Sequence, residues 1–318
     1  MNSSPLAARP RRGLVVGGAA LTALASTAAW VAQRARSTES RSPPAGNFIN
    51  VDNTRVHYVE RGHGTPLVLL HGNTLRLEDF VASGLVQRLA RNYRVLAFDR
   101  PGFGYSERPR SRLWTAAAQA SLLRQAFLQL GVERPIVLGH SWGTLVALEL
   151  ALMSSIGVRR LVLISGYYFA TPRLDAVLAA PVAVPVLGDV MRYTVSALSA
   201  RLLLGRTVKA MFAPQPVPVN FMSTLNREML LRPVQIRANS EDAAYLMPSA
   251  SVLQRRYRAI RSPAAILAGA ADKVVDPERH ARRLHAELEN SQLQVLPGVG
   301  HMLHHADPAT VLHAIGKN

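Results

Sequence analysis

Residues 139–143 read Gly139-His140-Ser141-Trp142-Gly143 and decide how this chain folds. They follow an apolar run at 135–138, which is typical of a buried strand, and they precede residues 144–152, which favour a helix. A strand that turns sharply into a helix through G-x-S-x-G leaves no room for a side chain at either glycine. The sequence therefore predicts a strained turn that lifts the hydroxyl of Ser141 clear of a sheet.

Two further strands lead to residues that fit the chemistry of this serine. A serine hydroxyl is a weak nucleophile until a base takes its proton, and the base itself needs an orienting group. Residues 264–268 are predicted as a strand that leads to Asp272, and residues 293–296 as a strand that leads to His301. Because parallel strands end at one edge of a sheet, the three side chains are expected to meet there.

On these residues the chain resembles the α/β-hydrolase superfamily, specifically its capped, single-domain bacterial members. The resemblance extends over roughly residues 48–316. It includes His71-Gly72-Asn73 after a predicted strand at 67–70, the motif Asp99-Arg100-Pro101-Gly102-Phe103-Gly104-Tyr105-Ser106, and the tail that begins at Gly300-His301. It implies an α/β fold with a mostly parallel central sheet, helices on both faces and an inserted helical cap.

The resemblance also implies a role for each site residue. Ser141 is the expected nucleophile and His301 the general base and then acid, while Asp272 orients the imidazole and stabilises its charged form. The backbone N–H groups of Asn73 and Trp142 are expected to form the oxyanion hole, which stabilises negative charge on the carbonyl oxygen under attack.

Other residues compete for these roles. Asp276 is an alternative to Asp272, but the spacing from Gly269 favours Asp272, and Asp276 is typical of a helix N-cap before a proline. Asp99 is expected to hydrogen-bond its own turn. His71 is expected to brace the oxyanion loop.

His304 and His305 are alternatives to His301 as the general base. The spacing of the three histidines would also fit a metal site. His301 is preferred because it directly follows a Gly-Val-Gly turn. The chain contains no cysteine and no H-E-x-x-H pair, so we expect no metal.

The nature of the nucleophile restricts the reaction. The haloalkane dehalogenases and epoxide hydrolases of this superfamily use an aspartate where this chain has Ser141, and an alkylated serine could not be hydrolysed readily. We therefore expect a cofactor-free serine hydrolase that forms an acyl-enzyme on an ester, a lactone or a related carbonyl, most simply a carboxylic ester. The alternatives are an acyltransferase or cofactor-free haloperoxidase-type activity on the same triad, or a non-catalytic ligand-binding member of the fold.

With 318 residues, the chain is long enough for one domain and an appendage. Strand patterns at 48–51, 56–60, 67–70, 95–98, 136–138 and 161–164 alternate with helical patterns. From 167 to 260 strand patterns stop, and apolar helical stretches are broken by prolines. We expect a core formed by 47–166 and 261–318, with 167–260 as the cap.

The N-terminal residues 1–46 form a separate segment. Residues 13–33 carry no charge and are flanked by Arg9, Arg11, Arg12, Arg34 and Arg36. A helix of that length spans about 30 Å, enough to cross a bilayer core. The segment is expected to be a membrane anchor or an export signal, either a cleaved signal or one of the twin-arginine type, followed by a linker at 37–46; a soluble alanine-rich helix is the alternative. We thus expect membrane association and a place in the bacterial cell envelope.

The formal charge of +17 raises the question of anionic partners. Apart from Lys209, Lys273 and Lys317, the basic residues are arginines scattered along the chain, without a basic run interleaved with aromatic residues. We expect no specific nucleic-acid partner. A weak attraction to anionic lipid and a small-molecule carbonyl substrate are the expected interactions.

Overall fold

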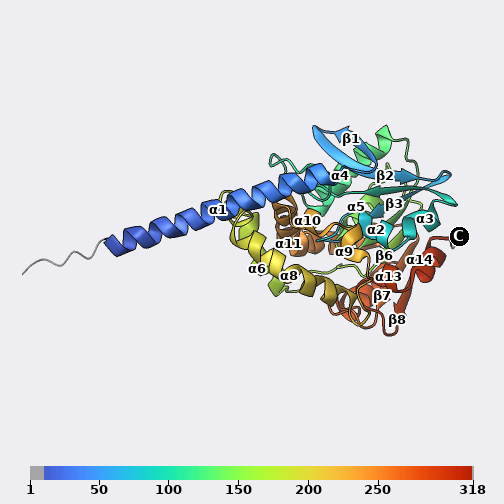
Figure 1. Ribbon diagram of the computed structural model, residues 1–318. Helices are drawn as coiled ribbons and strands as arrows, with labels where there is room; N and C mark the ends of the chain where they lie inside the picture. Colours follow the sequence, from blue (N-terminus) through green and yellow to red (C-terminus); the bar gives the residue numbers. More distant parts are fainter. Residues whose placement is uncertain (1–10, 317–318) are drawn as a thin grey trace, which may run out of the picture.

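The computed structural model describes residues 11–316, apart from the side chains of residues 11–15 and of Asp175. An eight-stranded sheet with the order β1-β2-β4-β3-β5-β6-β7-β8 forms its centre (Figure 1). The strands are β1 (Asn47–Val51), β2 (Thr54–Arg61), β3 (Thr65–Leu70), β4 (Tyr93–Phe98), β5 (Ile136–His140), β6 (Arg160–Ile164), β7 (Ala264–Gly269) and β8 (Ser291–Leu296). From β4 to β8 neighbouring strands are parallel, and β1 and β2 add an antiparallel edge. The expected α/β-hydrolase fold is confirmed.

The helices precede, connect and follow these strands. They are α1 (Arg11–Arg41), α2 (Glu78–Ala82), α3 (Leu85–Leu89), α4 (Ala116–Gln129), α5 (Gly143–Ala151), α6 (Leu174–Ala183), α7 (Leu187–Met191), α8 (Val195–Phe212), α9 (Phe221–Thr224), α10 (Arg227–Leu230), α11 (Pro233–Leu253), η1 (Gln254–Ala259), η2 (Glu278–Arg282), α12 (Arg283–Glu287), α13 (Leu303–Ala306) and α14 (Pro308–Gly316).

Successive side chains along the strands point to alternate faces of the sheet, which divides the hydrophobic core into two layers. Val68 and Leu70 of β3 pack with buried residues of α4, α5 and α12, whereas Leu67 and Leu69 pack with those of α2, α3, α13 and α14. Because successive side chains of a strand point to opposite faces, an apolar strand of this kind needs helices on both sides.

The segment between β6 and β7 holds α6 to α11 and η1 and contains no strand among its described residues. Its helices have a core of their own, in which Leu204 and Phe212 pack against Phe221, Leu230 and Leu231. This segment is the inserted helical region that the sequence indicated.

Helix α1 extends away from the body of the protein over its first half and packs against the cap with its second half (Figure 1). Val31 is buried with Val182 and Ile236, and Glu39 pairs with Arg232 at 2.7 Å. The helix continues to Arg41, so the linker expected at 37–46 is shorter than predicted. The contact with Arg232 holds the last turn, and the proline at 43 disfavours further helix.

The transmembrane span expected over 13–33 is not found. In the part of the chain that the structure describes, no helix is long and apolar enough to cross a membrane. Arg9 lies outside the described residues, and so do the side chains of Arg11 and Arg12, on which the twin-arginine alternative rested.

The turn between β5 and α5 has the strained conformation that its sequence predicted. Ser141 has a φ of 51°, in the left-handed region, and its N–H donates to the carbonyl of Ile164 at 2.9 Å. A Cβ at Gly139 would lie 2.7 Å from the carbonyl oxygen of Gly143, and one at Gly143 only 2.2 Å from that of Leu70. Backbone atoms therefore occupy the space of both side chains, which is why this turn needs the two glycines.

We predict that Gly143→Ala lowers the free energy of unfolding by more than about 2 kcal/mol, because the new methyl group overlaps backbone that cannot move away. Gly205→Ala in α8 is the matched control: its Cβ would meet nothing within 4 Å. In a helix interior that change should be neutral or stabilise by up to about 1 kcal/mol. Urea unfolding of both variants measures the difference, and equal stabilities would contradict this account of the turn.

Candidate active site

The site forms where the carboxyl ends of three parallel strands meet. Ser141 follows β5, Asp272 follows β7 and His301 follows β8. His301 Nδ1 lies 2.8 Å from Asp272 Oδ2, and both side chains are almost fully buried. A carboxylate at Nδ1 fixes that nitrogen as the N–H donor, which leaves Nε2 with the lone pair that a general base needs.

Asp272 is held as a carboxylate acceptor on its other oxygen as well. Its Oδ1 accepts the backbone N–H groups of Val274 at 2.8 Å and Val275 at 3.0 Å. Asp276, the alternative acid, instead accepts the N–H groups of Glu278 and Arg279 at the start of the next helix. Asp276 thus has the capping position that its sequence context indicated, and Asp272 is the partner of His301.

Ser141 and His301 line one cavity of about 360 Å³. No hydrogen bond joins the serine hydroxyl to the imidazole in the described part of the chain. Such bonds are often long before a substrate binds and shorten when it does. The structure therefore brings the three predicted side chains to one site, with the acid–base pair formed and the nucleophile beside it.

The backbone of His301 is fixed by a second histidine. His140 Nε2 lies 3.2 Å from the carbonyl oxygen of His301, and the two rings are 5.0 Å apart. Burial lowers the pKa of His140 well below its usual value, with contributions from the neighbouring His304 and His301. The neutral ring donates from Nε2 and holds the loop that carries the general base.

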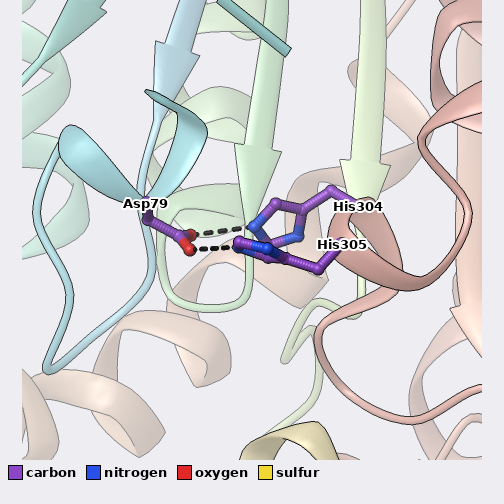
Figure 2. Close-up of side chains that lie close together, drawn as sticks. All are labelled: Asp79, His304 and His305. Atoms are coloured by element: carbon purple, nitrogen blue, oxygen red, sulfur yellow. Dashed lines mark hydrogen bonds and ion pairs between the residues drawn. The ribbon is translucent and has the colours of Figure 1, made fainter. Parts of the chain in front are cut away.

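His304 and His305, the competitors of His301, both bind Asp79 at the start of α2 (Figure 2). Their Nε2 atoms lie 2.9 and 2.8 Å from separate oxygens of this buried carboxylate. Burial opposes ionisation of Asp79, but the two imidazoles outweigh it and hold its pKa well below the usual value.

Asp79, His304 and His305 also form a group that could hold a metal ion, since one ligand atom of each lies within 4.8 Å of the others. The two hydrogen bonds account for this arrangement, because each carboxylate oxygen already accepts one imidazole N–H. We interpret the cluster as the connection between α2 and α13, the helix that follows the His301 loop.

The expected oxyanion loop lies directly beside the nucleophile. A Cβ at Gly72 would be 3.1 Å from Cβ of Ser141, closer than ordinary van der Waals contact, so a glycine suits this approach. The backbone N–H groups of Asn73 and Trp142 donate to no other group among the described residues. Two open donors beside a half-buried serine that lines a cavity are what stabilisation of an oxyanion requires.

His71 braces this loop, as the sequence indicated. Its Nδ1–H donates to the carbonyl of Gly72 at 2.7 Å, and its Nε2 accepts the N–H of Arg100 at 3.0 Å. Burial, reinforced by the cation of Arg100, lowers the pKa of His71 to about 3. The ring is therefore neutral at ordinary pH, which suits a side chain that donates at one nitrogen and accepts at the other.

Two residues of α11 that support the loop were missed by the sequence analysis. Asn239 accepts the N–H of Thr74 at 2.8 Å, and its backbone carbonyl accepts the side-chain amide of Asn73. Asp242 pairs with Arg100 at 2.6 Å, and its carbonyl accepts the indole N–H of Trp142 at 2.9 Å. No local motif marks either residue, because both act through contacts 100 or more positions away in the chain.

The cap closes the cavity above Ser141. Met211 and Leu246 are apolar cap residues that line the cavity, together with Ala176 and Ala210. Others fill the cap core instead, among them Phe212, Phe221 and Met222. Arg173 and Lys273 add positive charge to the lining.

We predict that His71 makes stability depend on pH. Between its ordinary pKa of 6.5 and about 3, the unfolded chain binds a proton that the folded chain excludes. Stability is therefore full above pH 6.5 and falls with decreasing pH, by at most ~1.4 kcal/mol per pH unit for this group. His71→Asn should make the free energy of unfolding fall less steeply between pH 6.5 and about 3. His140 and the other buried histidines are present in both proteins and contribute equally to both slopes. Urea unfolding at several pH values measures both slopes, and equal slopes would refute the assignment to His71.

Comparison with known proteins agrees with this geometry. The family model described as alpha/beta hydrolase fold matches residues 65–308. An uncharacterized protein of Mycobacterium tuberculosis is 27% identical over 290 residues, which cover 87% of this chain and 81% of that protein.

Two solved structures share the fold at low sequence identity. An esterase from Exiguobacterium antarcticum superposes with a TM-score of 0.71 at 20% identity and covers 86% of this chain and 100% of its own. A bacterial membrane phospholipase A superposes with a TM-score of 0.64 at 22% identity and covers 96% of this chain and 97% of its own. With a family model that matches most of its length, this chain belongs to the α/β-hydrolase fold family and is a hydrolase of that superfamily.

Proposed function

We propose that the chain is a serine hydrolase that cleaves a carboxylic ester through an acyl-enzyme. The observation that carries this proposal is the shared cavity of Ser141 and the His301–Asp272 pair, beside the open N–H groups of Asn73 and Trp142. A non-catalytic ligand-binding protein would need neither a left-handed serine nor a buried imidazole–carboxylate pair.

The geometry supports a two-step reaction. The Ser141 oxygen attacks the ester carbonyl while His301 Nε2 takes the hydroxyl proton, and Asp272 stabilises the imidazolium that forms. The carbonyl oxygen becomes negative and accepts the N–H groups of Asn73 and Trp142. The intermediate then collapses, His301 returns the proton to the departing alcohol, and the acyl group remains on Ser141.

Water completes the cycle by the same route. His301 takes a proton from water, the hydroxide attacks the acyl carbonyl, and the proton goes back to the Ser141 oxygen as the acid is released. A serine suits acyl transfer because its ester can be hydrolysed, whereas the ether that would form from a halide or an epoxide could not.

We also propose that the protein associates with the membrane of the cell envelope through its N-terminal segment. Support comes from α1, where Val16, Leu21, Leu24 and Trp30 are exposed apolar residues. Exposed apolar side chains in this number are unfavourable in water, and a lipid surface would cover them.

Replacing Ser141 tests the nucleophile. We predict that Ser141→Ala lowers the hydrolysis rate of p-nitrophenyl esters by about 10⁴-fold or more, because no other group forms the acyl-enzyme. The wild type should be labelled on Ser141 by a fluorophosphonate probe, and mass spectrometry should locate the adduct. Turnover that persists in the variant would refute this role.

Asp272 and Asp276 provide a matched pair. Asp272→Asn should lower the rate by about 10⁴-fold, because an amide neither fixes the imidazole nor stabilises its charge. Asp276→Asn should stay near the wild-type rate, since asparagine caps a helix as well as aspartate does. Ester hydrolysis assays on both variants distinguish the two residues, and a reversed order of losses would place the acid at 276.

A further inference from the structure

The outside of the cap is more apolar than the rest of the surface. Of the twenty large apolar side chains that are exposed in the described residues, twelve lie between residues 174 and 219 and four more lie on α1. We call the cap members on three helices and their connections the outer cap face: Leu174, Val177, Leu178, Val184, Val186, Leu187, Val190, Val195, Leu198, Leu202 and Leu203.

Packing within the chain does not explain this face. In α8, Ala197, Leu204, Val208 and Met211 point inward and are buried, as expected for one apolar stripe of a surface helix. Yet Val195, Leu198 and Leu202, at spacings of three and four residues, form a second stripe on the exposed side, where Leu202 is 80% exposed. A helix that is apolar on both sides is typical of a segment covered on both sides.

The outer cap face is continuous with α1. Val31 of α1, Val182 of α6 and Ala197 of α8 belong to one small hydrophobic cluster together with Ile236 of α11, so these helices meet around a shared core. Figure 1 shows α6 and α8 beside the base of α1, on the side from which α1 extends. The exposed apolar residues of α1 and those of the cap therefore belong to neighbouring elements.

The same two cap helices line the catalytic cavity. Ala176 of α6 and Thr207, Ala210 and Met211 of α8 face the space above Ser141. Whatever covers the outside of α6 and α8 is thus one helix layer away from the cavity.

The charged residues beside the outer cap face favour a negatively charged binding partner. Over residues 174–212 the sequence has two acidic residues, Asp175 and Asp189, and four basic ones. Of the basic residues, Arg206 and Lys209 are exposed on the last turns of α8, next in the series after Leu202. An apolar face bordered by cations fits the acyl region and the anionic headgroups of a phospholipid bilayer.

We infer that the outer cap face and α1 lie on an anionic phospholipid bilayer, and that the hydrolase takes a lipid acyl ester as its substrate from that surface. The part of this inference that concerns the substrate rests on the proposed function. The docking itself depends only on the surface.

Vesicle binding by the full chain tests the docking. Leu178→Asp/Leu202→Asp places two charges at the centre of the outer cap face, at side chains that are 71% and 80% exposed. Leu113→Asp/Leu128→Asp is the matched control, with the same charge change at exposed leucines outside the cap, 69% and 63% exposed. Co-sedimentation with vesicles of phosphatidylcholine and phosphatidylglycerol measures binding, and hydrolysis of p-nitrophenyl butyrate in solution reports that each variant is folded.

We expect the cap variant to lose about tenfold or more of its vesicle binding, and its hydrolysis of a long-chain ester in the vesicles to fall in parallel. The control variant should bind as the wild type does, and both should hydrolyse the soluble ester. Equal vesicle binding by the two variants would overturn the inference. So would a change from dimer to monomer in sedimentation velocity without a change in vesicle binding, because the face would then join two copies.

Ser141→Ala separates this inference from the proposed function. It should bind vesicles like the wild type and hydrolyse neither ester. If it retains hydrolysis while the cap variant loses binding, the nucleophile is wrong and the docking surface stands. If the wild type binds vesicles and hydrolyses the soluble ester but no lipid ester, the docking stands and the substrate class is wrong.

Discussion

A buried cation, Arg100, is the constraint on which the site depends. Its Nε donates to the carbonyl of His71 and one Nη to that of Gly72, while the other Nη reaches Gln119 and Asp242. Burial lowers the pKa of Arg100, and Asp242 acts against this. A buried guanidinium is tolerated only when its donors have partners, so the carbonyls of the oxyanion loop are drawn toward it. Those carbonyls then point away from Ser141, and the N–H groups of the loop remain for the substrate.

The same cation connects the core to the cap. Asp242 belongs to α11, and its carbonyl also receives the indole N–H of Trp142, the residue after the nucleophile. Arg100 lies 4.5 Å from the ring centroid of Trp142. The loop at 71–73, the turn at Ser141 and helix α11 are thus held by one group of contacts. A movement of α11 would therefore shift the N–H groups of Asn73 and Trp142, the proposed oxyanion donors, together. Cap and catalytic machinery form one unit in this respect.

Much of the fold and of the candidate site could be predicted from the sequence, because both depend on local patterns. Strand alternation located all eight strands, and the two glycines beside Ser141 specified a turn that only they allow. The choice of Asp272 over Asp276 followed from capping preferences, which are also local. The pairing of Asp242 with Arg100, and of His304 and His305 with Asp79, could not be found in this way, since these partners lie 142 to 226 positions apart and no pattern of spacing connects them. The end of α1 was misjudged for the same reason: Arg232 stabilises it from the cap.

The contact of Asp79 with His304 and His305 spans more than two thirds of the chain. Because translation proceeds from the N-terminus, α2 leaves the ribosome well before α13 does, and His301 lies between the two in the sequence. A nascent chain therefore contains Ser141 long before it contains His301, the base proposed to activate it. On the proposed mechanism, a product truncated before His301 would be inert.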